Sequence, residues 1–307
     1  MKRTYLFIIL ALVVAIAAAG CSQAATEESE TPTPTPIPTA TPEPTPEPIP
    51  DEWPVVDTDE LTLTISDTST DKDGSYIWSL DISNKSGSNV MLRMTGASLN
   101  GLACDPDWGL MLEPDASVAT DVLWKSDRLT SAGITGNIVT AAFHLTAYNA
   151  DDAEADNYLN DDFTVALIPG KTGFTYEVQP DDIVVLDTDE AAMIITSIAV
   201  RDDGEGVDAN VVLINKSDYA IRFAMPDTVI NDYEFVSATM DETVPAHTTC
   251  MTGFGWVYSY DWGYDMGYLD ADGELLPDMD YTLNMKFTNA DDITADALLN
   301  EGMSFVH

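Results

Sequence analysis

The sequence predicts an all-β protein, in which two tandem antiparallel β-sandwich domains follow a signal peptide and a disordered proline-rich stalk. Three observations support this prediction. A unit of about 130 residues occurs twice, short apolar runs alternate with polar residues, and the first 49 residues differ from the rest in composition. We expect the signal peptide at 1–20, the stalk at 21–49 and the two domains at 50–179 and 180–307.

The N-terminus carries two cations and then an apolar run from Leu6 to Ala19. The run is too short to span a bilayer and is typical of a secretory signal. The small residues directly before Cys21 resemble the lipobox of bacterial lipoproteins. This resemblance implies cleavage before Cys21, a lipid on its thiol and an extracellular chain anchored to the outer face of the cell membrane. An ordinary signal peptide is the alternative.

The stalk ends in "TPTPTPIPTATPEPTPEPIP", which holds nine of the 17 prolines of the chain. Proline at this density favours an extended polyproline II conformation and cannot pack a core. At ~3.1 Å per residue this stretch reaches about 60 Å. We therefore expect a stiff spacer that carries the domains away from the membrane.

The formal net charge of −41 excludes nucleic acid as a partner, because binding to phosphates requires clustered Lys and Arg. The partners that we expect are the membrane, through the N-terminal lipid, and a glycan, peptide or envelope-protein ligand. Cationic partners and divalent metals are also compatible with this charge. The acidic residues also have a simpler role, since they keep a surface protein soluble.

The repeated unit is visible as matching strings. "PDEWPVVDTDE" at 50–60 returns as "PDDIVVLDTDE" at 180–190, and "NKS" at 84–86 returns at 215–217. "NADDAEADNYLN" at 149–160 returns as "NADDITADALLN" at 289–300, identical at eight of twelve positions. Each unit has the size of a domain with its own core.

Within the first unit, apolar residues alternate with polar ones over short runs that are separated by turn-forming residues. This pattern predicts six or seven half-buried antiparallel strands per unit, and no long helical period is visible. The best architecture is a two-sheet sandwich of immunoglobulin type, without its disulfide. The expected strands include 61–65, 75–83, 89–94, 118–124, 141–147 and 163–168.

The strings "NKSGSNVMLRMTGASLNG", "WKSDRL", "AGI" and "FHLTAYNADD" resemble an uncharacterised immunoglobulin-like repeat of stalked lipoproteins from Gram-positive bacteria. The resemblance covers both units. It implies a fold and a location, but it carries no catalytic or binding residue. The second copy departs from the pattern between Trp256 and Leu276.

The repeated acidic string stands between the last two expected strands of each unit, where a hairpin connection belongs. Asn and Asp favour such turns. We expect Leu159 and Leu299 to fix a short helical turn there. Calcium is the alternative, although the string lacks the glycine and closing glutamate of an EF-hand, and "DADGE" at 270–274 fits a tight turn equally well. The candidate ligands are Asp151, Asp152, Asp156, Asn160, Asp291, Asp292, Asp296 and Asn300.

A row of aromatic residues is found only in the second copy. On an extended strand the first five rings face the same way, and planar rings of this kind hold sugars, peptides or quaternary amines. The alternative is that Trp256 matches the core residue Trp124 and that the tyrosines cover the sheet. The candidate ligand-binding residues are Trp256, Tyr258, Tyr260, Trp262, Tyr264 and Tyr268.

No catalytic motif, zinc spacing or phosphate-binding loop is visible in the sequence, so we expect a non-catalytic protein without a cofactor. Cys104 and Cys250 occupy non-matching points of the two units. We expect two free thiols, and a disulfide between the domains is the alternative. The predicted function is an anchored extracellular binding or adhesion module. The alternative is a structural surface protein or a subunit of an envelope complex.

Overall fold

The computed structural model describes residues 48–152, 154–202, 206–235, 239–257, 268–276, 279–292 and 294–306. Backbone contacts divide the chain into Met1–Pro44 and Thr45–His307, and all described strands lie in the second part. These strands form sheets that are antiparallel at all but one contact, so the prediction of an all-β sandwich protein is confirmed. Within the described ranges, no helix is long and apolar enough to cross a membrane.

The strands of the first repeat are β1 (Trp53–Asp57), β2 (Leu61–Thr70), β3 (Tyr76–Asn84), β4 (Val90–Leu99), β5 (Leu102–Ala103), β6 (Trp108–Leu112), β7 (Ser117–Trp124), β8 (Thr140–Asn149) and β9 (Leu159–Ala166). A short helix, α1 (Ser126–Ser131), follows β7. The strands of the second repeat are β10 (Ile183–Asp187), β11 (Ala191–Val200), β12 (Gly206–Asn215), β13 (Ile221–Ile230), β14 (Tyr233–Phe235), β15 (Met240–Val244), β16 (Thr249–Val257), β17 (Asp280–Asn289) and β18 (Leu299–Val306).

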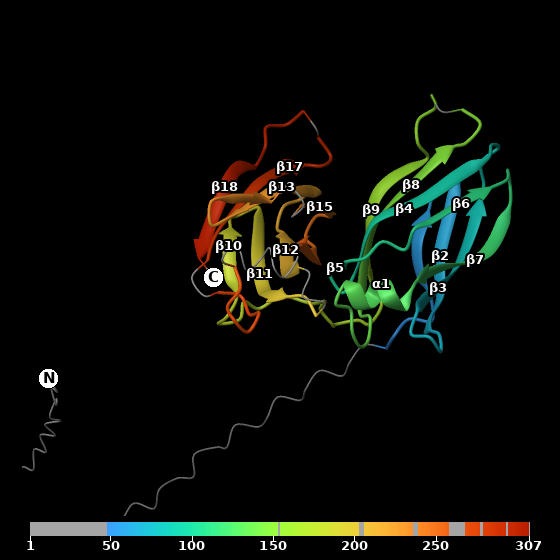
Figure 1. The fold of residues 1–307 in the computed structure, drawn as a ribbon. Helices are drawn as coiled ribbons and strands as arrows, with labels where there is room; N and C mark the ends of the chain where they lie inside the picture. The colour runs from blue at the N-terminus through green and yellow to red at the C-terminus, as the bar shows by residue number, and fades with distance from the viewer. Residues whose placement is uncertain are drawn as a thin grey trace, which may run out of the picture. The chain divides into compact units, whose positions relative to one another are not determined.

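Each repeat has strands in two sheets, and one sheet is shared, because β16 pairs with β5 and so joins strands of both repeats into a nine-stranded sheet. Figure 1 shows the first repeat in blue to green and the second in yellow to red. In the first repeat, one sheet has the order β1-β2-β3-β7, and the other is centred on β4 with β8 and β9 on one side. The second repeat reproduces this scheme with β10-β11-β12-β16 in one sheet and β13-β17-β18 in the other. The repeat in the sequence is therefore a repeat of topology.

The two repeats also share their irregularities. The register of β2 and β3 shifts between Ile65 and Asp67, and that of β11 and β12 shifts between Ile195 and Ser197. Since a bulge inserts one extra residue into a strand, the shared bulge keeps the alternation of the two repeats in phase. Positions on their strands can therefore be compared one to one.

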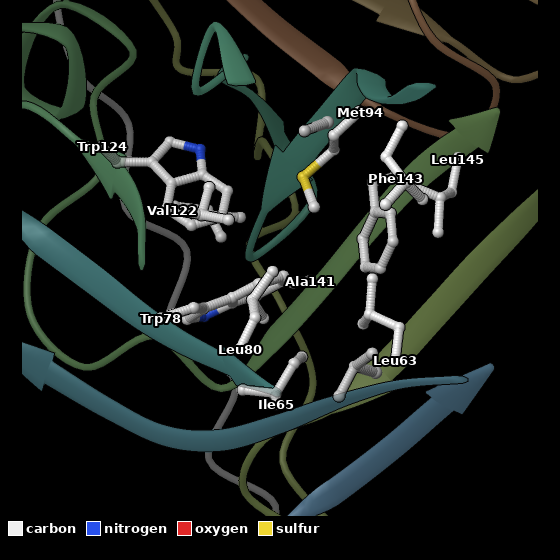
Figure 2. Close-up of a cluster of buried hydrophobic side chains, with 14 of the residues drawn as sticks. Leu63, Ile65, Trp78, Leu80, Met94, Val122, Trp124, Ala141, Phe143 and Leu145 are labelled. Carbon is white, nitrogen blue, oxygen red and sulfur yellow. The ribbon is translucent and has the colours of Figure 1, made fainter. Parts of the chain in front are cut away.

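The core of the first repeat is centred on three aromatic rings from both sheets (Figure 2). The ring of Trp78 on β3 meets the ring of Trp124 on β7 edge-on at 4.8 Å, and that of Phe143 on β8 at 5.7 Å. All three side chains are at most 3% exposed. Burial of each large apolar side chain stabilises the fold by roughly 1.5–3 kcal/mol. The period of two that predicted these strands thus reflects a shared core.

The second repeat has its own core. Phe223 on β13 and Phe287 on β17 are 4.5 Å apart, and Tyr281 stacks on Phe305 of β18 at 5.0 Å. Trp256 on β16, which corresponds to Trp124, lies 6.0 Å from Tyr281. The cores of the two repeats are separate clusters of buried residues.

One local expectation was wrong, and a helix and two short strands were not predicted. Leu159 and Leu299 do not fix a short helical turn but begin β9 and β18, where their backbones pair with the preceding strand. The helix α1 was not predicted, because six residues are too few to show a helical period. The strands β5 and β6 were missed because prolines, glycines and aspartates surround them, as in a loop.

Candidate functional site

The repeated "NKS" string forms a turn that is held by the hydrogen bonds of a buried asparagine. The side-chain amide of Asn215 donates to three carbonyl oxygens at 2.7–3.0 Å, those of Tyr219, Val244 and Pro245. Its Oδ1 accepts from both the backbone and the hydroxyl of Ser217. Asn84 forms the matching set in the first repeat. Both asparagines are buried, so this string closes the turn between two strands and offers nothing to a ligand.

The acidic string of the first repeat is bound to the backbone of the neighbouring turn. The carboxylate of Asp151 accepts from the backbone N–H and the side-chain amide of Asn89, at 2.9 Å each. The backbone N–H of Asp151 donates to Asn149 Oδ1 at 2.9 Å, which is an Asx turn. The hydrogen bonds from Asn89 lower the pKa of Asp151. This carboxylate thus serves to join the β8–β9 hairpin to the start of β4.

The second repeat repeats these contacts. Asp291 Oδ2 accepts from the backbone N–H of Ala220 at 2.9 Å, and the N–H of Asp291 donates to Asn289 Oδ1 at 2.8 Å. The next carboxylate also caps its own turn, because Asp292 Oδ1 accepts from the backbone N–H and the hydroxyl of Thr294. Turn formation accounts for these acidic residues in both copies.

The structure does not bring the candidate calcium ligands together. Asp152 accepts from the N–H of Glu154, while Asn160 lies on β9 with its Oδ1 3.2 Å from His144 Nε2. Asn300 lies on β18, and Asp156 and Asp296 are exposed. Over the described ranges, no group of three or more His, Cys, Asp or Glu residues is placed to hold a metal ion. Calcium binding was the alternative to the hairpin turn, and it stays untested.

The "DADGE" string forms a tight turn. Asp270 Oδ1 accepts from the backbone N–H groups of Asp272 and Glu274 at 2.9 and 3.0 Å. Gly273 has φ +83°, a conformation that glycine adopts without strain. The β2–β3 hairpin has the same arrangement, in which Asp71 accepts from the N–H groups two and four residues further on. The string therefore folds as an ordinary hairpin turn.

The structure divides the aromatic row. Trp256 and Tyr268 are each 1% exposed in the second core, and Phe235 lies between them with ring centroids 6.3 and 5.7 Å away. The expectation that these two rings form part of a surface platform was wrong, because both faces of each ring are covered. The other four predicted residues lie outside the described residues: Tyr258, Tyr260, Trp262 and Tyr264. In the sequence, Trp256 and Tyr268 stand before and after the segment that contains these four residues.

Both cysteines described in the structure are free thiols. Burial raises the pKa of Cys104 to about 11 and that of Cys250 to about 12. A thiol with a raised pKa is a poor nucleophile at neutral pH. Neither cysteine is a candidate catalytic residue.

A cavity of about 340 Å³ opens beside Cys104, and its lining includes Arg128 and Met251. Asp105 and Asp127 also line this cavity, so the guanidinium of Arg128 does not create a positive site for an anion. Burial raises the pKa of Asp105, which accepts from the N–H of Ala97 at 2.6 Å. The cavity favours no single class of ligand.

Sequence reasoning missed a paired lysine contact. Lys85 Nζ donates to the carbonyl of Thr58 at 2.8 Å, and Lys216 Nζ donates to that of Thr188 at 2.7 Å. Each lysine also pairs with the aspartate before that threonine. The signal was visible, because "DTDE" and "NKS" both repeat and the chain has only 12 Lys and Arg residues in total.

Comparison with protein-family models and with curated proteins found no match for this chain.

Proposed function

We propose that this chain is a membrane-anchored extracellular lipoprotein with a non-catalytic binding or adhesion role, whose ligand contacts lie in the aromatic segment of the second repeat. The ligand class is a glycan, a peptide or an envelope protein. The two sandwiches are the scaffold, and the repeated polar strings are used to fold it.

The observation that carries this proposal is the position of the aromatic segment between two buried anchors. Trp256 and Tyr268 are fixed in the second core, and Tyr268 donates from its hydroxyl to the carbonyl of Ile230 at 3.3 Å. The intervening residues include two tyrosines, a tryptophan and a further tyrosine that have no counterpart in the first repeat. Binding residues are commonly found on segments that a rigid scaffold holds at both ends.

Anchoring is supported by the sequence of the first 50 residues. The lipobox-like residues before Cys21 and the proline-rich stalk fit a protein that is held at a membrane and extended away from it. The second candidate function is that of a structural surface protein or an envelope-complex subunit with no small ligand. The turn chemistry shared by both repeats favours it, because none of those contacts needs a ligand.

The experiment is a binding assay with the soluble chain from Ser22 to His307 and its Tyr260→Ala/Trp262→Ala/Tyr264→Ala variant on cells, isolated wall material and a glycan array. We expect the triple variant to lose at least about tenfold in affinity, since each ring contributes to stacking. The matched control is Phe174→Ala, which removes a 39% exposed ring from another segment. Equal binding by wild type and triple variant overturns the proposal and favours the structural role.

A further inference from the structure

The outer face of the β10-β11-β12-β16 sheet is apolar and covered. Successive residues of a strand face opposite sides of a sheet, yet residues 191–195 of β11 are all buried. Met193 and Ile195 point into the second core, so Ile194 points away from it, and it is still only 2% exposed. Val212, its partner on β12, is 3% exposed. Another part of the protein must therefore cover this face.

The first repeat provides a matched comparison. The strands β2 and β3 pair in the same register as β11 and β12, because Leu61 lies opposite Asn84 and Ala191 lies opposite Asn215. The pair of Ile194 and Val212 therefore corresponds to Thr64 and Asp81, which are paired on β2 and β3. Asp81 is exposed and Thr64 is partly exposed. The outer face is thus polar in the first repeat and apolar in the second. An apolar outer face is expected where other residues cover it.

The first repeat contacts this face at Met251. Met251 on β16 pairs with Val212 and packs against the core of the first repeat. A Cβ at Gly133, in the turn that follows α1, would come within 2.3 Å of Met251 Sδ. The N–H of Thr249 donates to the carbonyl of Gly101 at 2.8 Å, in a parallel contact between β16 and β5. The side-chain contact of Met251 and the backbone contact of Thr249 are therefore both made with the first repeat.

We infer that the apolar face formed by Ile194, Val212 and Met251 is a built docking surface for the first repeat, and that the two repeats form one rigid cooperative body without a hinge. This inference goes beyond the proposed function and does not rest on it. An exposed isoleucine and valine would cost solubility, whereas burial against the first repeat stabilises both.

The matching end of the second repeat is charged. Asn100 and Asn231 correspond, because both have positive φ and both accept a backbone N–H through Oδ1. The next residue is Gly101 in the first repeat, where it bonds to Thr249, and Asp232 in the second. A carboxylate thus stands in the second repeat where the first repeat has the glycine that contacts β16, so this turn differs between the two repeats.

The test uses the chain from Ser22 to His307 with Ile194→Thr, which installs the residue of the first repeat, and with Ile194→Asp. Thr64→Asp is the control for a charge at the matching position, and Ile195→Val is the control for a loss of core packing on the same strand. Calorimetry measures whether the repeats unfold together. Thiol labelling of Cys104 and Cys250 measures opening, because Cys104 shares a cavity with Met251.

We expect wild type and both controls to unfold in one transition. Ile194→Thr should lower a first transition by at least about 4 °C, separate it from the second, and raise the rate of thiol labelling about tenfold. Two transitions in wild type, or a single transition and unchanged labelling in Ile194→Thr, overturn the inference. If Ile194→Asp does not fold, Ile194→Thr decides, because the first repeat folds with threonine at this position.

Discussion

The carboxylate of Asp151 joins two turns of the first repeat by accepting the backbone N–H and the side-chain amide of Asn89. In the second repeat, Asp291 accepts the backbone N–H of Ala220, which has no side-chain amide. Only the backbone bond is common to both copies. A backbone N–H that needs an acceptor is therefore sufficient reason for an aspartate to occur at this place twice.

Asp151→Ala should increase the rate of hydrogen exchange at the amide of Asn89 by about tenfold, because this N–H loses its acceptor. The control is Asp156→Ala in the same string, where the side chain is exposed. Exchange measured residue by residue by NMR checks the prediction. Unchanged protection of Asn89 in Asp151→Ala would contradict the structural role of this carboxylate.

The same contact should be lost in acid. The hydrogen bonds from Asn89 hold the pKa of Asp151 below the ordinary value of 3.8. The contribution of Asp151 to stability is therefore present above pH 3.8 and is lost as the pH falls through the lowered pKa. Protection of the Asn89 amide, measured from pH 5 to pH 2, should decrease over this range. An equal decrease in Asp151→Ala would show that another group titrates.

Asn215→Ala should lower the free energy of unfolding by about 3 kcal/mol, because three carbonyl oxygens lose their donor in a buried site. Asn84→Ala should have a similar effect in the first repeat. Urea denaturation followed by tryptophan fluorescence measures both. The control is Asn210→Ala, since that exposed side chain donates only to Ser197 Oγ among the contacts described. A decrease in the free energy of unfolding as small as that of the control would contradict the structural role of Asn215.

The two thiols should destabilise the fold at high pH. Burial raises the pKa of Cys104 to about 11 and that of Cys250 to about 12, from an ordinary value of 9.0. The unfolded chain releases these protons first, so stability is unaffected below pH 9 and falls as the pH rises above it. Denaturation at pH 8 and pH 10 should show a smaller loss in Cys104→Ala/Cys250→Ala. Equal losses would argue against two thiols that stay protonated in the folded chain at pH 10.

The proposed lipid anchor predicts that Cys21→Ser releases the chain from the membrane, because the variant lacks the thiol to which we expect the lipid to be attached. Cell fractionation and labelling with a radioactive fatty acid check this prediction. Cys104→Ser is the matched control and should remain labelled and in the membrane fraction. Continued membrane association of unlabelled Cys21→Ser would contradict the lipid anchor.

The strands with a clear period of two were predictable from the sequence. Trp78, Trp124 and Phe143 alternate with polar neighbours, and they meet in one core because both sheets bury one face. The apolar run that contains Ile194 lacks such alternation. The local sequence cannot show that both faces of this strand are covered, because the second layer comes from a distant part of the chain.

The candidate site was predictable only in part. Extended geometry places Trp256 in line with the aromatic residues that follow it, but it also places it in line with Phe254, which is buried. The ring of Trp256 is therefore buried, because β16 continues to alternate and every second side chain points into the core. Tyr268 could not be assigned from spacing, because its burial depends on Phe235 of a distant strand.

The duplicated carboxylates Asp151 and Asp291 join turns of the two repeats, and we propose that ligand recognition belongs to residues that the repeats do not share. Thermal melts of the chain from Ser22 to His307 in EDTA, millimolar calcium and millimolar magnesium test the role of these carboxylates most directly. We expect the same Tm in calcium and in magnesium, because the hydrogen bonds of these turns need no metal. A rise of several degrees in calcium alone would contradict it and would assign the acidic strings to a calcium site that stabilises the native state.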